Sequence, residues 1–136
     1  MTNKEYLRQL RSLQREIQEL AQEQKDLQDL ATAIGSTTVT GPRVKTSPKQ
    51  EARYVELILK VAELQRKIVI RADEMVRLRE KIIAAIDRMS RTEEQMVLKY
   101  RYLHMYTWEA IAEAMHASRA TVIRWHGSAL LHFKQR

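Results

Sequence analysis

Residues 107–122 read TWEAIAEAMHASRATV, and this stretch decides the fold expected for the C-terminal part of the chain. Thr107 is a suitable N-cap for a short helix whose apolar residues lie on one side. A tight turn at 116–118 follows, and a longer helix is expected at 119–133. Two helices joined by so short a turn predict a helix-turn-helix, a motif that binds DNA through its second helix.

The helix expected at 119–133 has an apolar side and a polar, basic side. Arg124 lies on the polar side, where an arginine can donate two hydrogen bonds to a guanine in the major groove. The inward residues are Val122, His126, Ala129, Leu130 and Phe133. The residues predicted to contact DNA are Thr107, Ser118, Arg119, Thr121, Arg124 and Ser128, with Lys99 and Arg101 adding positive charge behind them.

A further helix is expected before this pair. Ser90 and Glu93 have the spacing of a capping box, which predicts that a helix begins here. It should bury Val97, Leu98 and Tyr100 and end near Leu103 or His104. Residues 90–136 are therefore predicted to form a three-helix DNA-binding domain.

The N-terminal part of the chain has the pattern of two long helices. The first is predicted at 3–34, with Thr2 and Glu5 as a capping box and Gly35 as the left-handed residue that ends it. Its heptad seam consists of Leu10, Leu13, Ile17, Leu20, Leu27, Ala31 and Ile34.

The second long helix is predicted at 48–89, after a basic linker at 35–47 that is rich in turn residues. Ser47 and Gln50 favour a capped start, with Pro48 at the first helical position. The seam of this helix consists of Tyr54, Leu57, Val61, Leu64, Ile68, Met75, Leu78, Ile82, Ala85 and Met89.

Each seam contains one polar residue, Gln24 in the first helix and Arg71 in the second, which we interpret as determinants of register or oligomeric state. The two helices can fold back on each other, with Ile17 near Arg71, or pair with those of another subunit. The expected fold is all-α: a long antiparallel coiled-coil hairpin at 1–89, followed by a helix-turn-helix domain at 90–136.

The composition points to a nucleic-acid partner. The 136 residues carry a formal net charge of +7 and include no cysteine, which excludes disulfides, thiolate nucleophiles and cysteine-based zinc sites. The histidines have no carboxylate at metal-site spacing, and neither a catalytic motif nor a membrane-spanning apolar run occurs. We therefore expect a cytoplasmic protein that binds double-stranded DNA, forms homo-oligomers, needs no cofactor or metal and is not an enzyme.

The predicted motif resembles the C-terminal region of bacterial sigma factors, which reads the −35 promoter element. The resemblance rests on residues 107–112 (TWEAIA), 118–122 (SRATV) and 129–130 (AL). A more specific resemblance, over about the last two-thirds of the chain, is to the phage RinA/ArpU-like regulators of late-gene transcription. It rests on residues 46–49 (TSPK), 100–103 (YRYL), 107–109 (TWE), Ser118 and 124–130 (RWHGSAL).

These resemblances imply an activator of phage or mobile-element late genes that acts at a promoter, with host RNA polymerase as a further partner. Two alternatives stay open. One is a DNA-packaging protein similar to a terminase small subunit, although such proteins usually have the DNA-binding domain first in the chain. The other is a coiled-coil adaptor that binds RNA polymerase, against which the outward Arg124 argues.

Overall fold

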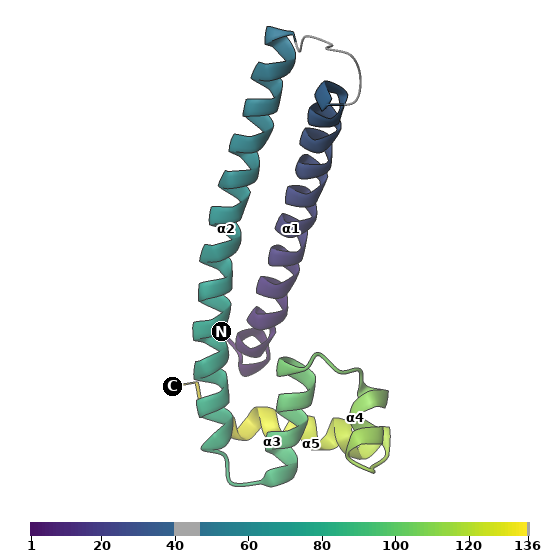
Figure 1. The fold of residues 1–136 in the computed structure, drawn as a ribbon. Coiled ribbons are helices and arrows are strands. Elements are labelled where there is room, and N and C mark those ends of the chain that lie inside the picture. Colours follow the sequence, from purple (N-terminus) through teal and green to yellow (C-terminus); the bar gives the residue numbers. More distant parts are fainter. Residues whose placement is uncertain (40–46, 136) are drawn as a thin grey trace. The chain divides into compact units, whose positions relative to one another are not determined.

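The structure, a computed structural model, describes residues 1–39 and 47–135. These ranges contain helices and no strand, and the two long N-terminal helices pack together (Figure 1), so the expected all-α class is confirmed. Residues 40–46 of the predicted linker lie outside the described residues. The elements are α1 (Asn3–Val39), α2 (Pro48–Asp87), α3 (Thr92–Leu98), the π-helical turn η1 (Lys99–Leu103), α4 (Trp108–Ala114) and α5 (Arg119–His132).

Within the described ranges, no helix has the length and apolar character needed to cross a membrane.

Residues 15–73 form one compact unit, in which α1 and α2 run side by side in opposite directions (Figure 1). Both polar seam residues bridge the two helices. Gln24 Nε2 donates to Gln65 Oε1 at 2.8 Å and to the Val61 carbonyl at 3.3 Å. Arg71 Nε donates to Glu16 Oε1 at 2.7 Å, within one residue of the predicted register. The helices of one chain can therefore satisfy each other's polar seam positions.

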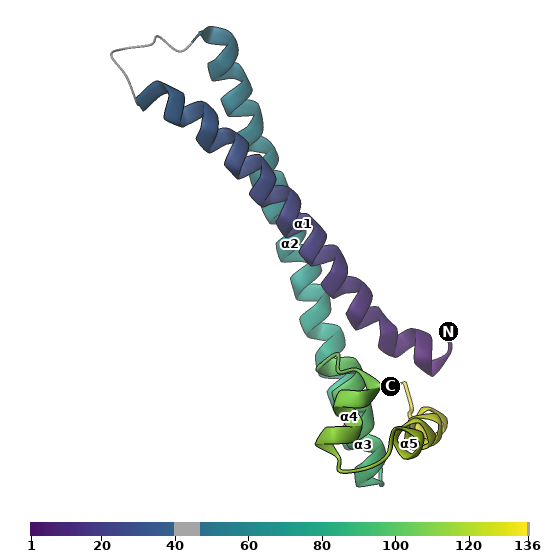
Figure 2. The ribbon, with the colours of Figure 1, turned by 90° about the vertical axis from the view of Figure 1, so that its right-hand side faces the viewer.

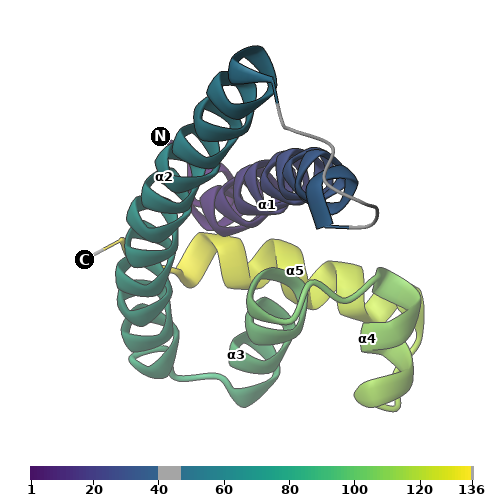
Figure 3. The same cartoon turned by 45° about the horizontal axis from the view of Figure 1, so that its top comes forward.

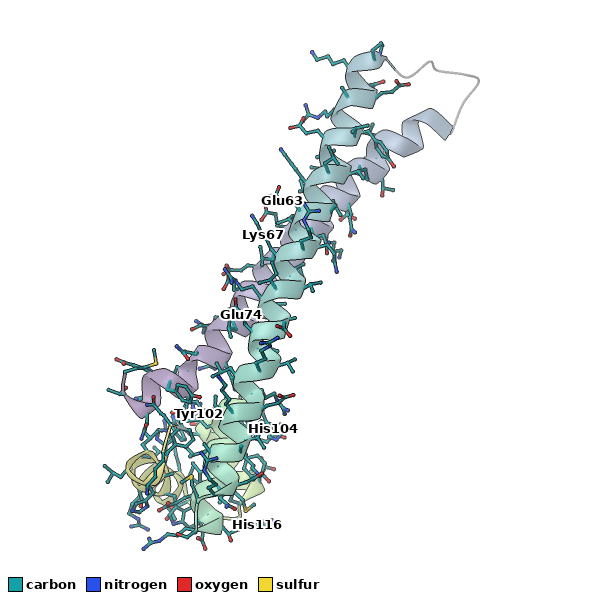
Figure 4. All side chains as sticks on the ribbon, turned by 90° about the vertical axis from the view of Figure 1, so that its left-hand side faces the viewer. Glu63, Lys67, Glu74, Tyr102, His104 and His116 are labelled. Atoms are coloured by element: carbon teal, nitrogen blue, oxygen red, sulfur yellow. The ribbon has the colours of Figure 1, made fainter. Side chains whose placement is uncertain are left out.

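The outer surface of α2 in this unit also carries i, i+4 ion pairs. Glu63 and Lys67 lie one turn apart on α2 (Figure 4), with 3.9 Å between their charged groups. Both side chains are more than half exposed, so the pair adds little to the free energy of unfolding.

The predicted caps of the long helices are confirmed. Thr2 Oγ1 accepts from the Glu5 amide, and the Glu5 carboxylate accepts from the Thr2 amide. Ser47 and Gln50 make the same reciprocal pair at the start of α2. The predicted end at Gly35 is wrong, because α1 continues to Val39. A glycine permits a left-handed residue without requiring it, and inside a helix it costs only about 1 kcal/mol.

Residues 1–14 and 74–136 form the second compact unit, so the predicted domain boundary at 89/90 does not match the compact units. The reason is a shared apolar core, to which every part of this unit except α4 contributes. It consists of Leu7, Leu10, Ile82, Ala85, Ile86, Leu98, Tyr102, Ala129 and Phe133. Leu7, which lies outside the predicted seam, is fully buried.

Hydrogen bonds also tie the beginning of α1 to the end of α5 in this unit. Asn3 Nδ2 donates to the carbonyls of Leu130 at 2.7 Å and Phe133 at 2.8 Å. The Leu130 carbonyl belongs to the last turn of α5, where no further helical amide is available, and Phe133 is the C-cap residue that follows the helix. The side chain of Asn3 thus caps a helix that follows it by about 130 residues.

The predicted capping box at Ser90 and Glu93 is wrong. The helix α3 begins at Thr92, after Arg91, and no side chain caps its first amides. Instead, Gln95 Nε2 donates to the Met89 carbonyl at 2.6 Å and fastens the turn between α2 and α3. Val97 and Leu98 are buried and the helical segment ends at Leu103, as predicted, whereas Tyr100 is only half-buried.

The turn between α4 and α5 is a Schellman motif. The Ala117 amide donates to the Ala112 carbonyl at 3.0 Å, and the His116 amide donates to the Glu113 carbonyl at 3.3 Å. His116 (labelled in Figure 4) has a φ angle of 53°, which is the left-handed conformation that this motif usually gives to glycine.

We expect His116→Gly to stabilise the protein by up to about 1 kcal/mol, because glycine adopts this conformation without the steric cost of a Cβ. Thermal unfolding of wild type, His116→Gly and His116→Ala would measure the effect. Equal melting temperatures for the glycine and alanine variants would contradict it.

Candidate nucleic-acid interface

A small apolar cluster holds α4 and α5 against each other and against α3. Val97, Ile111 and Val122 are fully buried in this cluster, one from each helix. Trp125 is half-buried beside them. Figure 3 shows α5 running from α4 past α3, and Figure 2 shows α5 nearly end-on beside them. The side of α5 that turns away from this cluster is therefore presented on a firmly held helix.

Two predicted site residues serve as helix caps. Thr107 Oγ1 accepts from the Ala110 amide at 3.2 Å, and Ser118 Oγ accepts from the Thr121 amide at 3.2 Å. The Ser118 and Thr121 hydroxyls also share a hydrogen bond of 2.8 Å. Thr107 and Ser118 are exposed and Thr121 is half-buried, so the three hydroxyls fix the starts of α4 and α5 at the protein surface.

Arg119 and Arg124 are the exposed cations of α5. Arg119 Nε lies 3.3 Å from Glu109 Oε1 of α4. Both side chains of this pair are more than 60 % exposed, so the pair is weak and Arg119 can exchange its partner at little cost. Arg124 extends from the next turn on the outward side, as predicted.

The sequence prediction missed two further residues on this outward side. Ile123 is 43 % exposed, although its β-branched apolar side chain suggested a buried position. A Cβ added at Gly127 would meet nothing within 4 Å, so the helix surface there is open. Gly127 lies three residues after Arg124 and four after Ile123, so it shares a face of the helix with each of them.

Ser128, also predicted to contact DNA, is half-buried and turned toward α3. Its hydroxyl donates to Glu94 Oε1 at 2.7 Å. Glu94 lies on α3, is 3 % exposed and also lies 2.9 Å from His132 Nδ1. Ser128 and His132 are one helical turn apart on α5, so together they attach this helix to the buried carboxylate.

The environment of Glu94 lowers the pKa of its carboxyl below the usual value of 4.5. Burial alone raises this pKa, but hydrogen bonds from Ser128 and His132 and the charges of His132 and Arg91 outweigh that effect. Glu94 is thus charged at neutral pH. The buried position of Glu94 was not predictable from the sequence, because a lone glutamate in a helix is normally exposed.

A second buried polar contact joins η1 to α5. The Tyr102 hydroxyl lies 2.7 Å from His126 Nε2, and both residues are about 6 % exposed. The edge of the Trp108 ring also meets the His126 ring, with 4.8 Å between centroids. The inward position predicted for His126 is confirmed.

The two basic residues predicted behind the site have different surroundings. Lys99 Nζ donates to Asp87 Oδ1 at 2.8 Å, so its charge is balanced by α2. Arg101 donates to the Tyr106 carbonyl at 2.9 Å, and its guanidinium lies 4.3 Å from the centre of the Trp108 ring. Arg101 is thereby held in one orientation by a carbonyl and an aromatic face.

Burial and, to a smaller extent, the positive charges of Lys4, Arg101 and Arg8 together lower the pKa of His126 from 6.5 to about 4. Because the folded protein binds this proton less readily than the unfolded chain, His126 favours folding above pH 6.5. That contribution is lost as the pH falls from 6.5 to about 4.

We expect the stability of wild type relative to a His126→Phe variant to fall over this pH range by on the order of 3 kcal/mol at most. Urea unfolding of both proteins at several pH values would measure the difference, in which other titrating groups cancel. A difference that is independent of pH would show that His126 takes up its proton equally in both states.

The residues of this site lie within the part of the chain that a family model covers. That model, described as a protein of unknown function (DUF1492), matches residues 31–134. The chain belongs to the DUF1492 family. The comparisons with curated proteins and with solved structures gave no match. In residues 1–39 and 47–135 of this DUF1492 protein, no three histidine, aspartate or glutamate side chains are grouped as metal ligands would be.

Proposed function

We propose that this DUF1492 protein is a sequence-specific DNA-binding regulator of transcription that inserts the outward side of α5 into the major groove. The observation that carries the proposal is the combination of exposed Arg124 with the open surface at Gly127 on a helix fixed by a buried cluster. In a helix-turn-helix, the second helix reads base edges with such side chains.

The chemistry of this side suits DNA. Arg124 matches the two acceptors of a guanine, Ile123 can contact the methyl group of a thymine, and Gly127 lets the helix backbone approach closely. Arg119, Thr107 and Ser118 lie where phosphate contacts are made at the helix starts. The net charge of +7 supports the same partner. The resemblance to RinA/ArpU-like regulators adds the expectation of activation at a late promoter with host RNA polymerase.

We expect Arg124→Ala to weaken binding to the preferred DNA sequence by about 1–3 kcal/mol and to relax selectivity at one base pair. The preferred sequence would come from selection of bound duplexes from a random pool, and fluorescence anisotropy would give the affinities. Arg79→Ala, which removes an exposed arginine from α2, is the matched control. Equal losses by Arg124→Ala on selected and random duplexes would contradict base reading.

We further propose that a second copy of the chain covers the outer side of α2. Positions 55, 58, 62, 65, 69 and 72 alternate in steps of three and four, which is a second heptad stripe beside the seam that faces α1. Gln65 lies at the edge that this stripe shares with the seam, where it also bonds Gln24 of α1. Val55, Ile58 and Val69 in this stripe are 54 %, 42 % and 56 % exposed. Such spacing fits another long helix rather than an extended peptide.

The stripe is complementary to itself in an antiparallel pair. Around a two-fold axis at its centre, Val55 faces Ala72, Ile58 faces Val69 and Ala62 faces Gln65. A larger side chain thus packs against alanine in two of these three pairs, Val55 with Ala72 and Gln65 with Ala62. The dipoles of the two antiparallel helices also oppose each other. This pairing is a homodimer, which agrees with the homo-oligomer expected from the sequence.

We expect Ile58→Lys with Val69→Lys to convert the dimer to a monomer that keeps its helical content, because both residues are exposed within one chain. Sedimentation velocity and circular dichroism would measure mass and helicity. The control adds the same charge at exposed α1 positions, with Gln18→Lys and Thr32→Lys. An unchanged mass for the α2 variant would contradict this interface.

A further inference from the structure

A hollow of about 110 Å³ lies between the beginning of α1, η1, α4 and α5, on the inward side of α5. It is larger than a single water molecule, whose share of the liquid is about 30 Å³. Four of its lining residues are cations: Lys4, Arg8, Arg11 and Arg101. The others are Tyr102, Met105, Trp108 and His126, so no lining residue carries negative charge.

Helical spacing and core packing bring the four positive charges together. Lys4, Arg8 and Arg11 recur at steps of four and three on α1, which places them on one face of the helix. That face is set against η1 by burial of Leu7 and Leu10 in the shared core. Arg101 is held toward the same hollow by the Tyr106 carbonyl and the Trp108 ring.

The groups around the hollow respond to this excess of positive charge. Burial, followed by the charge of Arg11, lowers the pKa of Arg101. Tyr102 opposes this effect, Arg8 adds to it, and Glu109 makes the smallest, opposing contribution. His126 stays neutral at pH 7 beside these cations, for the reasons given above. Like charges gathered around a partly buried hollow destabilise the protein unless an anion joins them.

We propose that this hollow is a binding site for a phosphate group. A phosphate offers several acceptor oxygens and up to two negative charges, which suits guanidinium and ammonium donors. When Nε2–H of His126 donates to the Tyr102 oxygen, the Tyr102 hydroxyl is free to donate to the bound group. The phosphate can belong to a small phosphorylated molecule or to a DNA backbone, and these sources are separable by experiment.

The first test uses pyrophosphate on the full chain, with sodium chloride at equal ionic strength as the reference. Wild type is compared with Arg8→Gln and with Arg79→Gln, an exposed α2 arginine outside the hollow. We expect pyrophosphate to raise the melting temperature of wild type and Arg79→Gln by several degrees, and Arg8→Gln to lose most of this shift. We also expect Arg8→Gln to melt higher than wild type in chloride alone, because one of the crowded charges is gone.

Calorimetric titration with pyrophosphate should show at least tenfold weaker binding to Arg8→Gln than to Arg79→Gln. Equal responses of the three proteins to pyrophosphate would overturn the proposal. This arm contains no DNA, so its result is independent of the function proposed for α5.

The second test identifies the source of the phosphate by measuring binding to random duplex DNA. If the site holds a backbone phosphate, Arg8→Gln weakens binding on all sequences, lowers the slope of log affinity against log salt by about 1, and makes pyrophosphate a competitor. If the site holds a small ligand, Arg8→Gln and Arg79→Gln bind DNA equally. Either result, together with the pyrophosphate response, supports the site.

Discussion

The apolar core shared by the beginning of α1, the end of α2 and the C-terminal helices is the contact on which the rest of the structure depends. Leu7 and Ile82 are fully buried in it, although neither lies in the C-terminal segment that carries the outward arginines. Three short helices alone would bury little apolar surface, because small domains have a high ratio of surface to volume. The long helices therefore supply the core that keeps α5 in place.

Two buried polar contacts add orientation to this core. Glu94 holds Ser128 and His132, and Tyr102 holds His126, so α5 is fixed at three positions along its inward side. Nonpolar packing alone tolerates small rotations of a helix, whereas buried hydrogen bonds are costly to break. A helix whose rotation is fixed presents the same side chains to a partner each time, which is what readout of base edges requires.

The two sides of α5 thus have different tasks in our proposals. The outward side offers an arginine, an exposed isoleucine and an open glycine, which suit base edges. The inward side closes over a cation-lined hollow, whose charges are contributed by residues near the beginning of α1 and by η1. A phosphate there would neutralise charge within the same compact unit and so stabilise the contact between α1 and the C-terminal helices.

The sequence by itself determined the local features: the helices, most of their caps, the inward side of α5 and the register of Gln24 and Arg71. These depend on residues close in the chain or on a repeat of fixed period. The tertiary structure decided that Leu7 and Asn3 join the C-terminal helices, that Ser128 binds Glu94 and that Arg8 and Arg101 line the same hollow. Such contacts join residues distant in sequence, and no periodicity records which distant segments will pack together.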